Sequence, residues 1–100
     1  MIIYYVPCKN KKEARTIANE LLNQRLIVCA NISRSESVYE WEGKIKNNRE
    51  SVLWIKTLDK HEEEVRNIIS KLHSYEVPAI IRLVGRANNK YISWMESCVK

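Results

Sequence analysis

The chain has 100 residues, of which 45% are hydrophobic and 29% are charged, and its formal net charge is +5. This length and composition predict one folded domain spanning residues 1–100, and they exclude both a disordered chain and a chain with two cores. No apolar run approaches the roughly 18 residues that a membrane-spanning helix needs, so that class of protein is excluded as well.

The N-terminal part of the chain predicts a strand followed by a helix. Residues Met1 to Val6 are apolar and rich in β-forming types, which is typical of a central strand buried on both faces. Apolar residues at helical spacing then predict a helix from Lys11 to Arg25, and Asn10 with Glu13 resembles a capping box at its start.

A long β-hairpin is expected next. Strand-like runs occupy residues 26–32, 38–46 and 51–57, and Asn47-Asn48 offers a turn. The arms of this hairpin are much longer than an ordinary strand of five or six residues. We therefore expect the hairpin to project beyond the rest of the sheet.

The C-terminal half predicts a helix, a strand and a last helix. Asp59 and Glu62 are expected to open the first of these helices, and the strand is expected from Val77 to Val84. The last helix should follow Asn88-Asn89. Apolar side chains at helical spacing mark the two helices: Val65, Ile68, Ile69 and Leu72 in the first, and Tyr91, Trp94, Met95 and Cys98 in the last.

The resulting order is βαββαβ with an extra C-terminal helix, which predicts an α+β, ferredoxin-like sandwich with both crossover helices on one face of the sheet. The other face is then uncovered, although the strands carry apolar residues on both sides. The projecting hairpin would also expose Tyr39, Trp41 and Trp54. We therefore expect a closed homo-oligomer, whose subunit number this reasoning leaves open.

The net positive charge does not by itself indicate nucleic acid, because basic residues are interleaved with glutamates along most of the chain. The three cysteines, Cys8, Cys29 and Cys98, cannot all pair within one chain and show no C-x-x-C spacing, so reduced thiols are expected. No basic stretch precedes the first apolar run, and a cytoplasmic location follows as an expectation.

Five segments, in this order, resemble the CutA divalent-cation-tolerance family over essentially the whole chain: Leu21 to Ile32, Tyr39 to Ile45, Lys56-Thr57, His73 to Ile80 and Tyr91 to Trp94. The resemblance implies a homotrimer of ferredoxin-like subunits assembled through the long hairpin. It also implies a binding function in tolerance to divalent cations, with weak affinity for copper(II) or a similar ion and no tightly bound cofactor.

His73 and Cys8 are the candidate metal ligands. His73 matches the family's histidine after the second helix, and imidazole binds copper and zinc; the alternative is a cation at the C-terminus of the helix or a structural hydrogen-bond partner. Cys8 lies beside Lys9 near a helix start, where a thiolate is favoured, and the alternative is an inert surface thiol. The cysteine of bacterial relatives corresponds to Val6 here, so Cys8 would act only with a shifted geometry. Cys29 and Cys98 are expected to be packing residues.

Six further residues resemble the family's recurrent aromatic and polar set: Tyr39, Trp41, Glu42, Lys56, Tyr75 and Glu76. Trp54, which the projecting hairpin would expose, is grouped with them as a candidate interface or cleft residue. Two accounts remain open for them, namely the core of a subunit interface and a cleft between subunits that binds a small ligand. No catalytic triad, phosphate-binding glycine loop or H-E-x-x-H motif is present, so an enzyme is not expected. The alternative function is a trimeric small-ligand sensor or scaffold without physiological metal binding.

Overall fold

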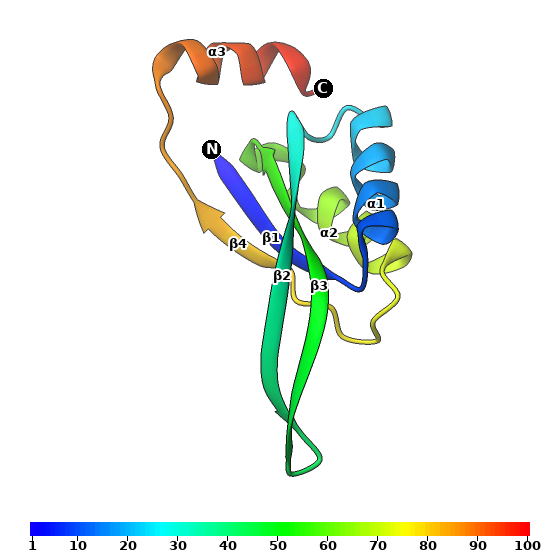
Figure 1. Ribbon diagram of the computed structural model, residues 1–100. Coiled ribbons are helices and arrows are strands. Elements are labelled where there is room, and N and C mark those ends of the chain that lie inside the picture. The colour runs from blue at the N-terminus through cyan, green and yellow to red at the C-terminus, as the bar shows by residue number, and fades with distance from the viewer.

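The computed structural model describes all 100 residues and contains the expected βαββαβ order followed by a C-terminal helix. The α+β prediction is therefore confirmed (Figure 1). The elements are β1 (Ile2–Cys8), α1 (Lys11–Asn23), β2 (Cys29–Trp41), β3 (Lys44–Thr57), a short 3₁₀ turn (Asp59–His61), α2 (Glu62–Leu72), β4 (Ile81–Val84) and α3 (Asn89–Cys98).

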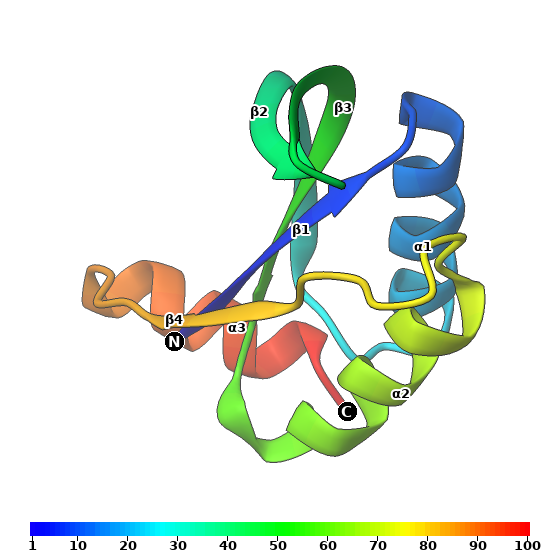
Figure 2. The same cartoon turned by 90° about the horizontal axis from the view of Figure 1, so that it is seen from below.

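The four strands form one antiparallel sheet in the order β2-β3-β1-β4. Ile2 of β1 lies opposite Thr57 of β3 on one side and opposite Val84 of β4 on the other. Figure 2 shows α1 and α2 together on one face of this sheet and α3 on the opposite side. This is the arrangement that two interleaved βαβ units produce.

The main core lies between the sheet and the helices α1 and α2. Alternate residues of β1, including Tyr4 and Val6, point into it and are almost completely buried. They pack in one cluster with Ile17 and Leu21 of α1 and with Ile69 of α2. Each such aliphatic side chain contributes roughly 1.5 to 3 kcal/mol when it leaves water, so this cluster holds both helices on the sheet.

The opposite face of the sheet is covered only at one end. There Met95 of α3 forms a small buried cluster with Val28 and Val99. Tyr91 of α3 also reaches the strand, with its hydroxyl 3.6 Å from the Cys29 sulfur. Cys29 is therefore half-buried on this face rather than part of the main core.

The hairpin of β2 and β3 projects far beyond the rest of the molecule (Figure 1). The whole chain, hairpin included, measures 47 Å along its longest axis. Its turn is at Glu42 and Gly43, so the predicted turn at Asn47-Asn48 was wrong. Both turn residues have left-handed backbone conformations, with φ of 51° and 77°, as a two-residue hairpin turn requires. Asn47 and Asn48 instead pair with β2 inside a continuous strand.

The C-terminal strand also differs from its prediction. β4 begins at Ile81, so residues 77–80, including Pro78, are outside the strand. The predicted Asp59 cap is not made either, because the Asp59 carboxylate accepts a hydrogen bond from Arg82 at 2.7 Å instead. This ion pair links the start of α2 to β4, which no local sequence pattern reveals. Asn88 precedes α3 as expected but makes no side-chain cap.

Helix α1 has the predicted start and an earlier end. The Asn10 side chain accepts the Glu13 backbone N–H at 2.9 Å, as the capping pattern indicated. The helix ends at Asn23 because Arg25 adopts φ of 57°, and the N–H groups of Arg25 and Leu26 return to earlier carbonyls of the helix. This is a Schellman-type termination with arginine where glycine is usual.

Candidate functional site

Cys8 is the last residue of β1 and its side chain is completely buried. The expectation of a surface thiol was therefore wrong, because β1 continues through Pro7 and ends at Cys8. Burial, reinforced by the negative charges of Glu13 and Glu50, raises the pKa of Cys8 from 9.0 to about 12. The thiol is consequently protonated at neutral pH, which is the opposite of the thiolate expected beside Lys9.

His73 lies just after α2, and both nitrogens of its buried ring have partners. Nε2 is 2.8 Å from the Pro7 carbonyl oxygen, and Nδ1 accepts the Tyr75 backbone N–H at 3.1 Å. This pattern assigns the proton to Nε2, which donates it to Pro7, and a neutral ring. The contact joins β1 to the segment that follows α2.

Glu13 lies close to both Cys8 and His73, although the sequence indicated only a capping role for it. Its Oε1 accepts the Lys9 N–H at 3.0 Å, and its Oε2 accepts the Ser74 N–H at 2.9 Å. Burial alone favours the neutral carboxyl, but hydrogen bonds from Ser74 and Lys9 outweigh it and lower the pKa of Glu13. Glu13 is thus a buried carboxylate 3.8 Å from His73 Nδ1.

The fold brings the two predicted ligands together with this carboxylate. One donor atom from each of Cys8, Glu13 and His73 lies within 4.8 Å of the others, and all three residues are buried. Sulfur, imidazole nitrogen and carboxylate oxygen are donors that zinc and copper accept. However, each donor already has a protein partner or a proton, so an ion has to displace existing interactions to bind.

A second group connects the hairpin to the segment after α2. The Tyr75 hydroxyl donates to Glu50 Oε2 at 2.6 Å, and the Ser37 hydroxyl donates to the other carboxylate oxygen. Burial, followed by the hydrogen bond to Glu50, raises the pKa of Tyr75. Glu50 and Ser37 were not singled out from the sequence, since an isolated glutamate and serine in a polar strand carry no distinguishing pattern.

An open cavity of about 940 Å³ lies beside this group, between the hairpin and the segment 75–79. Four of the predicted interface or cleft residues line it: Tyr39, Trp41, Tyr75 and Glu76. The Trp41 side chain is 60% exposed in the single chain. The cavity also has apolar walls at Val38 and Val77, so it combines aromatic, aliphatic and charged surface.

The other three predicted interface or cleft residues lie elsewhere. Trp54 packs edge-on against Tyr5, with ring centroids 4.9 Å apart, and its indole N–H donates to Ser33 at 3.0 Å. Lys56 lies between β1 and β2 at the far end of β3. Glu42 is in the hairpin turn. The structure therefore divides the predicted set among the sheet, the hairpin tip and the cavity.

No helix in the structure is both long enough and apolar enough to cross a membrane. The model of the CutA1 divalent ion tolerance protein family matches residues 2–98. A divalent-cation tolerance protein CutA from Pyrococcus horikoshii is 40% identical over 96 residues, which cover 95% of this chain and 94% of that relative.

Solved structures agree with this assignment. CutA1 from Pyrococcus horikoshii superimposes with a TM-score of 0.93 at 38% identity, covering 100% of this chain and 99% of the other. CutA from Archaeoglobus fulgidus, described as a periplasmic divalent cation tolerance protein, gives 0.93 at 31% identity and covers 100% of both chains. The resemblance seen in the five sequence segments is confirmed, and the chain belongs to the CutA1 divalent ion tolerance family.

Proposed function

We propose that this protein acts in tolerance to divalent cations in the cytoplasm as a homotrimer that binds a divalent ion such as copper(II) weakly. The observation that carries the metal proposal is the group of Cys8, Glu13 and His73, whose donor atoms lie within 4.8 Å of one another. The names of the relatives, which describe tolerance to divalent cations, support the same function.

The partners of these donors explain why the affinity is weak. To bind an ion, His73 gives up the Tyr75 N–H at Nδ1 or the Pro7 carbonyl at Nε2. A Cys8 thiol with a pKa of about 12 also has to release its proton. Binding therefore competes with folding contacts, and it strengthens as pH rises because less work is needed to deprotonate the thiol.

The test is calorimetric titration with copper(II) under anaerobic conditions. We expect saturable heat in the parent protein and its loss in His73→Ala and Cys8→Ser. His73→Gln is the second variant, because its side-chain amide can still donate to Pro7 but cannot ligate as imidazole does. His61→Ala, which removes the other histidine, serves as the control. No saturable heat in the parent, or equal losses in His61→Ala, would contradict the proposal.

The trimer is supported by the surface that a single chain leaves uncovered. Along the hairpin, Val38 is 63% exposed and Ile45 is 78% exposed. On the uncovered sheet face, Ile81 and Leu83 of the short edge strand β4 are also exposed. Apolar side chains and unpaired strand edges on one face are the features that association between copies removes. The number three comes from the family resemblance.

The alternative is a small-ligand sensor or scaffold, and the cavity of about 940 Å³ favours it because it places Tyr39, Trp41, Tyr75 and Glu76 around one space. A thermal-shift screen of metabolites separates the two functions. A ligand of the cavity raises the melting temperature by mass action, and Trp41→Ala abolishes that shift while His73→Gln leaves it intact. The reverse pattern would favour the metal site.

A further inference from the structure

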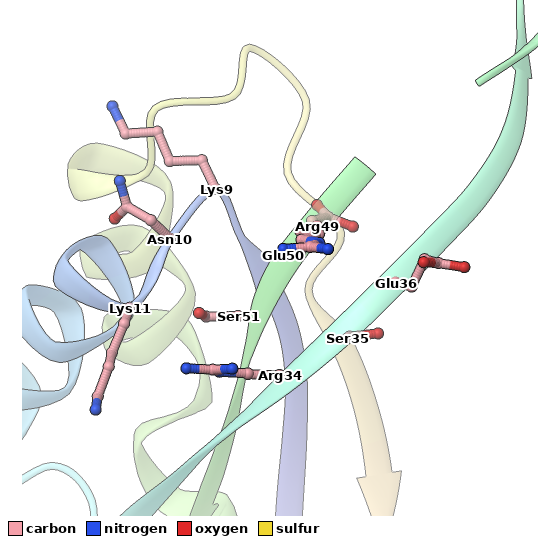
Figure 3. Close-up of a pocket in the computed structure, with 9 residues that line it drawn as sticks. All are labelled: Lys9, Asn10, Lys11, Arg34, Ser35, Glu36, Arg49, Glu50 and Ser51. Atoms are coloured by element: carbon pink, nitrogen blue, oxygen red, sulfur yellow. The ribbon is translucent and has the colours of Figure 1, made fainter. Parts of the chain in front are cut away.

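A second cavity, of about 580 Å³, lies between the start of α1 and the middle of the hairpin (Figure 3). Glu50 is the one residue that it shares with the cavity beside Tyr75, and no hydrophobic residue lines it. Its walls are Lys9, Asn10 and Lys11 on the α1 side and Arg34, Ser35, Glu36, Arg49, Glu50 and Ser51 on the hairpin. We call this space the polar pocket.

The polar pocket carries an excess of positive charge. Four cationic side chains line it, at Lys9, Lys11, Arg34 and Arg49, against two carboxylates. None of these four cations is in an ion pair within the chain; the salt bridges of the structure involve only Arg82 and the two histidines. Four unpaired cations around one cavity make a surface that attracts anions.

The two carboxylates do not neutralise this charge. Both oxygens of Glu50 accept hydrogen bonds from Ser37 and Tyr75, which belong to the other cavity. In Figure 3 the Glu36 carboxylate points away from Lys9 and Lys11. The anion-attracting side of the polar pocket is thus the gap between α1 and the hairpin.

Hydrogen-bond donors face this gap from both walls. Arg34 and Ser51 are directly paired across the two strands, and Figure 3 shows both side chains pointing toward the start of α1. Opposite them, Lys11 begins α1, where the helix dipole adds partial positive charge. A ligand in the gap therefore meets a guanidinium and a hydroxyl, beside the positive charge of the helix start and of Lys11.

The chemistry of the walls selects the class of ligand. A guanidinium fork binds phosphate oxygens in pairs, and a hydroxyl and an ammonium add single donors. The absence of any apolar or aromatic wall leaves a nucleobase nothing to stack on. We propose that the polar pocket binds a compact anion that carries two linked phosphate groups, held by Arg34, Ser51 and Lys11. This inference is independent of metal binding, because none of Cys8, Glu13 and His73 lines the pocket.

The test is calorimetric titration of the purified protein with inorganic pyrophosphate at low ionic strength. We expect saturable binding that weakens by at least about tenfold in Arg34→Gln and in Lys11→Gln, the consequence of losing one charged hydrogen bond. Lys12→Gln is the matched control, since Lys12 has the same charge and follows Lys11 in α1 but does not line the pocket. Parallel titrations use sulfate and citrate.

The outcomes decide the proposal in either direction. Binding of pyrophosphate that is reduced in both pocket variants and unchanged in Lys12→Gln supports it. An absence of saturable binding, or an equal loss in Lys12→Gln, would overturn it, because net charge alone would then explain any attraction. Citrate binding as tightly as pyrophosphate would overturn the assignment of phosphate. Sedimentation of each variant shows whether it assembles as the parent does. If Arg34→Gln on the hairpin changes assembly, Lys11→Gln on α1 still measures the loss of pyrophosphate binding.

Discussion

The hydroxyl of Tyr75 donates a 2.6 Å hydrogen bond to the carboxylate of Glu50, across 25 positions of the chain. This contact ties the segment after α2 to the projecting hairpin. The same segment carries His73, whose ring is bonded to Pro7. Loop and hairpin are thereby held in one arrangement around the larger cavity.

Replacing Tyr75 with phenylalanine removes this hydrogen bond and keeps the ring. We expect Tyr75→Phe to lower the free energy of unfolding by about 1 kcal/mol, since both side chains are half-buried and water restores part of the lost interaction. Urea unfolding followed by tryptophan fluorescence measures the change. Tyr5→Phe is the control, because no hydrogen bond of the Tyr5 hydroxyl is present to be lost. Equal stability of Tyr75→Phe and the parent would show that the contact contributes nothing.

Replacing Trp41 tests whether the hairpin is a surface through which copies of the chain associate. If the exposed ring is enclosed between copies, Trp41→Ala weakens assembly by roughly 3 to 5 kcal/mol. Sedimentation velocity over a dilution series then shows smaller species in the variant at concentrations where the parent remains assembled. Leu22→Ala, at an exposed leucine of α1, should sediment as the parent does. An unchanged profile in Trp41→Ala would remove this residue from the interface.

Arg25 tests the termination of α1. Its φ of 57° favours glycine, so we expect Arg25→Gly to raise the free energy of unfolding by about 0.5 to 1 kcal/mol. Gln24 has φ of −86°, and Gln24→Gly should instead be neutral or destabilising because glycine is more flexible in the unfolded chain. Thermal melts of the two variants measure the contrast. A stability loss in Arg25→Gly would contradict the conformational argument.

Cys8 predicts a loss of stability at alkaline pH. Its pKa is raised to about 12 in the folded protein, from an ordinary value of 9.0. The unfolded chain therefore releases the thiol proton at a lower pH than the folded protein does. The contribution of the protonated Cys8 thiol to the free energy of unfolding is complete below about pH 9 and is lost as pH rises toward 12. We expect the parent to lose stability between pH 8 and about 11 more steeply than Cys8→Val, measured by urea unfolding in reducing buffer. Parallel slopes would contradict this origin.

The elements of the fold follow from patterns within short windows of sequence. Helical spacing and the Asn10 cap define the start of α1, and alternating runs define both hairpin arms. The hairpin turn was misplaced because Asn47-Asn48 is a favourable local turn sequence, whereas cross-strand pairing over the whole of β2 and β3 places the turn at Gly43. Tertiary pairing outweighed the local preference.

The candidate site was predictable only in part. His73 and Cys8 were recognised by their chemistry and by resemblance, while their proximity to Glu13 depends on how α1 and α2 pack. The burial of Cys8 also depends on β1 continuing through Pro7. Pro7 is compatible with a central strand because β4 pairs with β1 only as far as Tyr5. No residue of β4 therefore lies beside Pro7 to need the N–H that proline does not have.

Glu42 and Gly43, at the hairpin tip, set the register between β2 and β3 although they lie far from the rest of the molecule. A side chain added at Gly43 would meet no atom within 4 Å, so only its backbone conformation matters there. Inserting or deleting one residue at this point would slip the two arms past each other by one position, and every side chain of the displaced arm would turn to the opposite side of the ribbon. Tyr39 and Trp41 would then face away from their present cavity. A change of one residue at the hairpin tip would thus alter which side chains the hairpin presents to neighbouring copies.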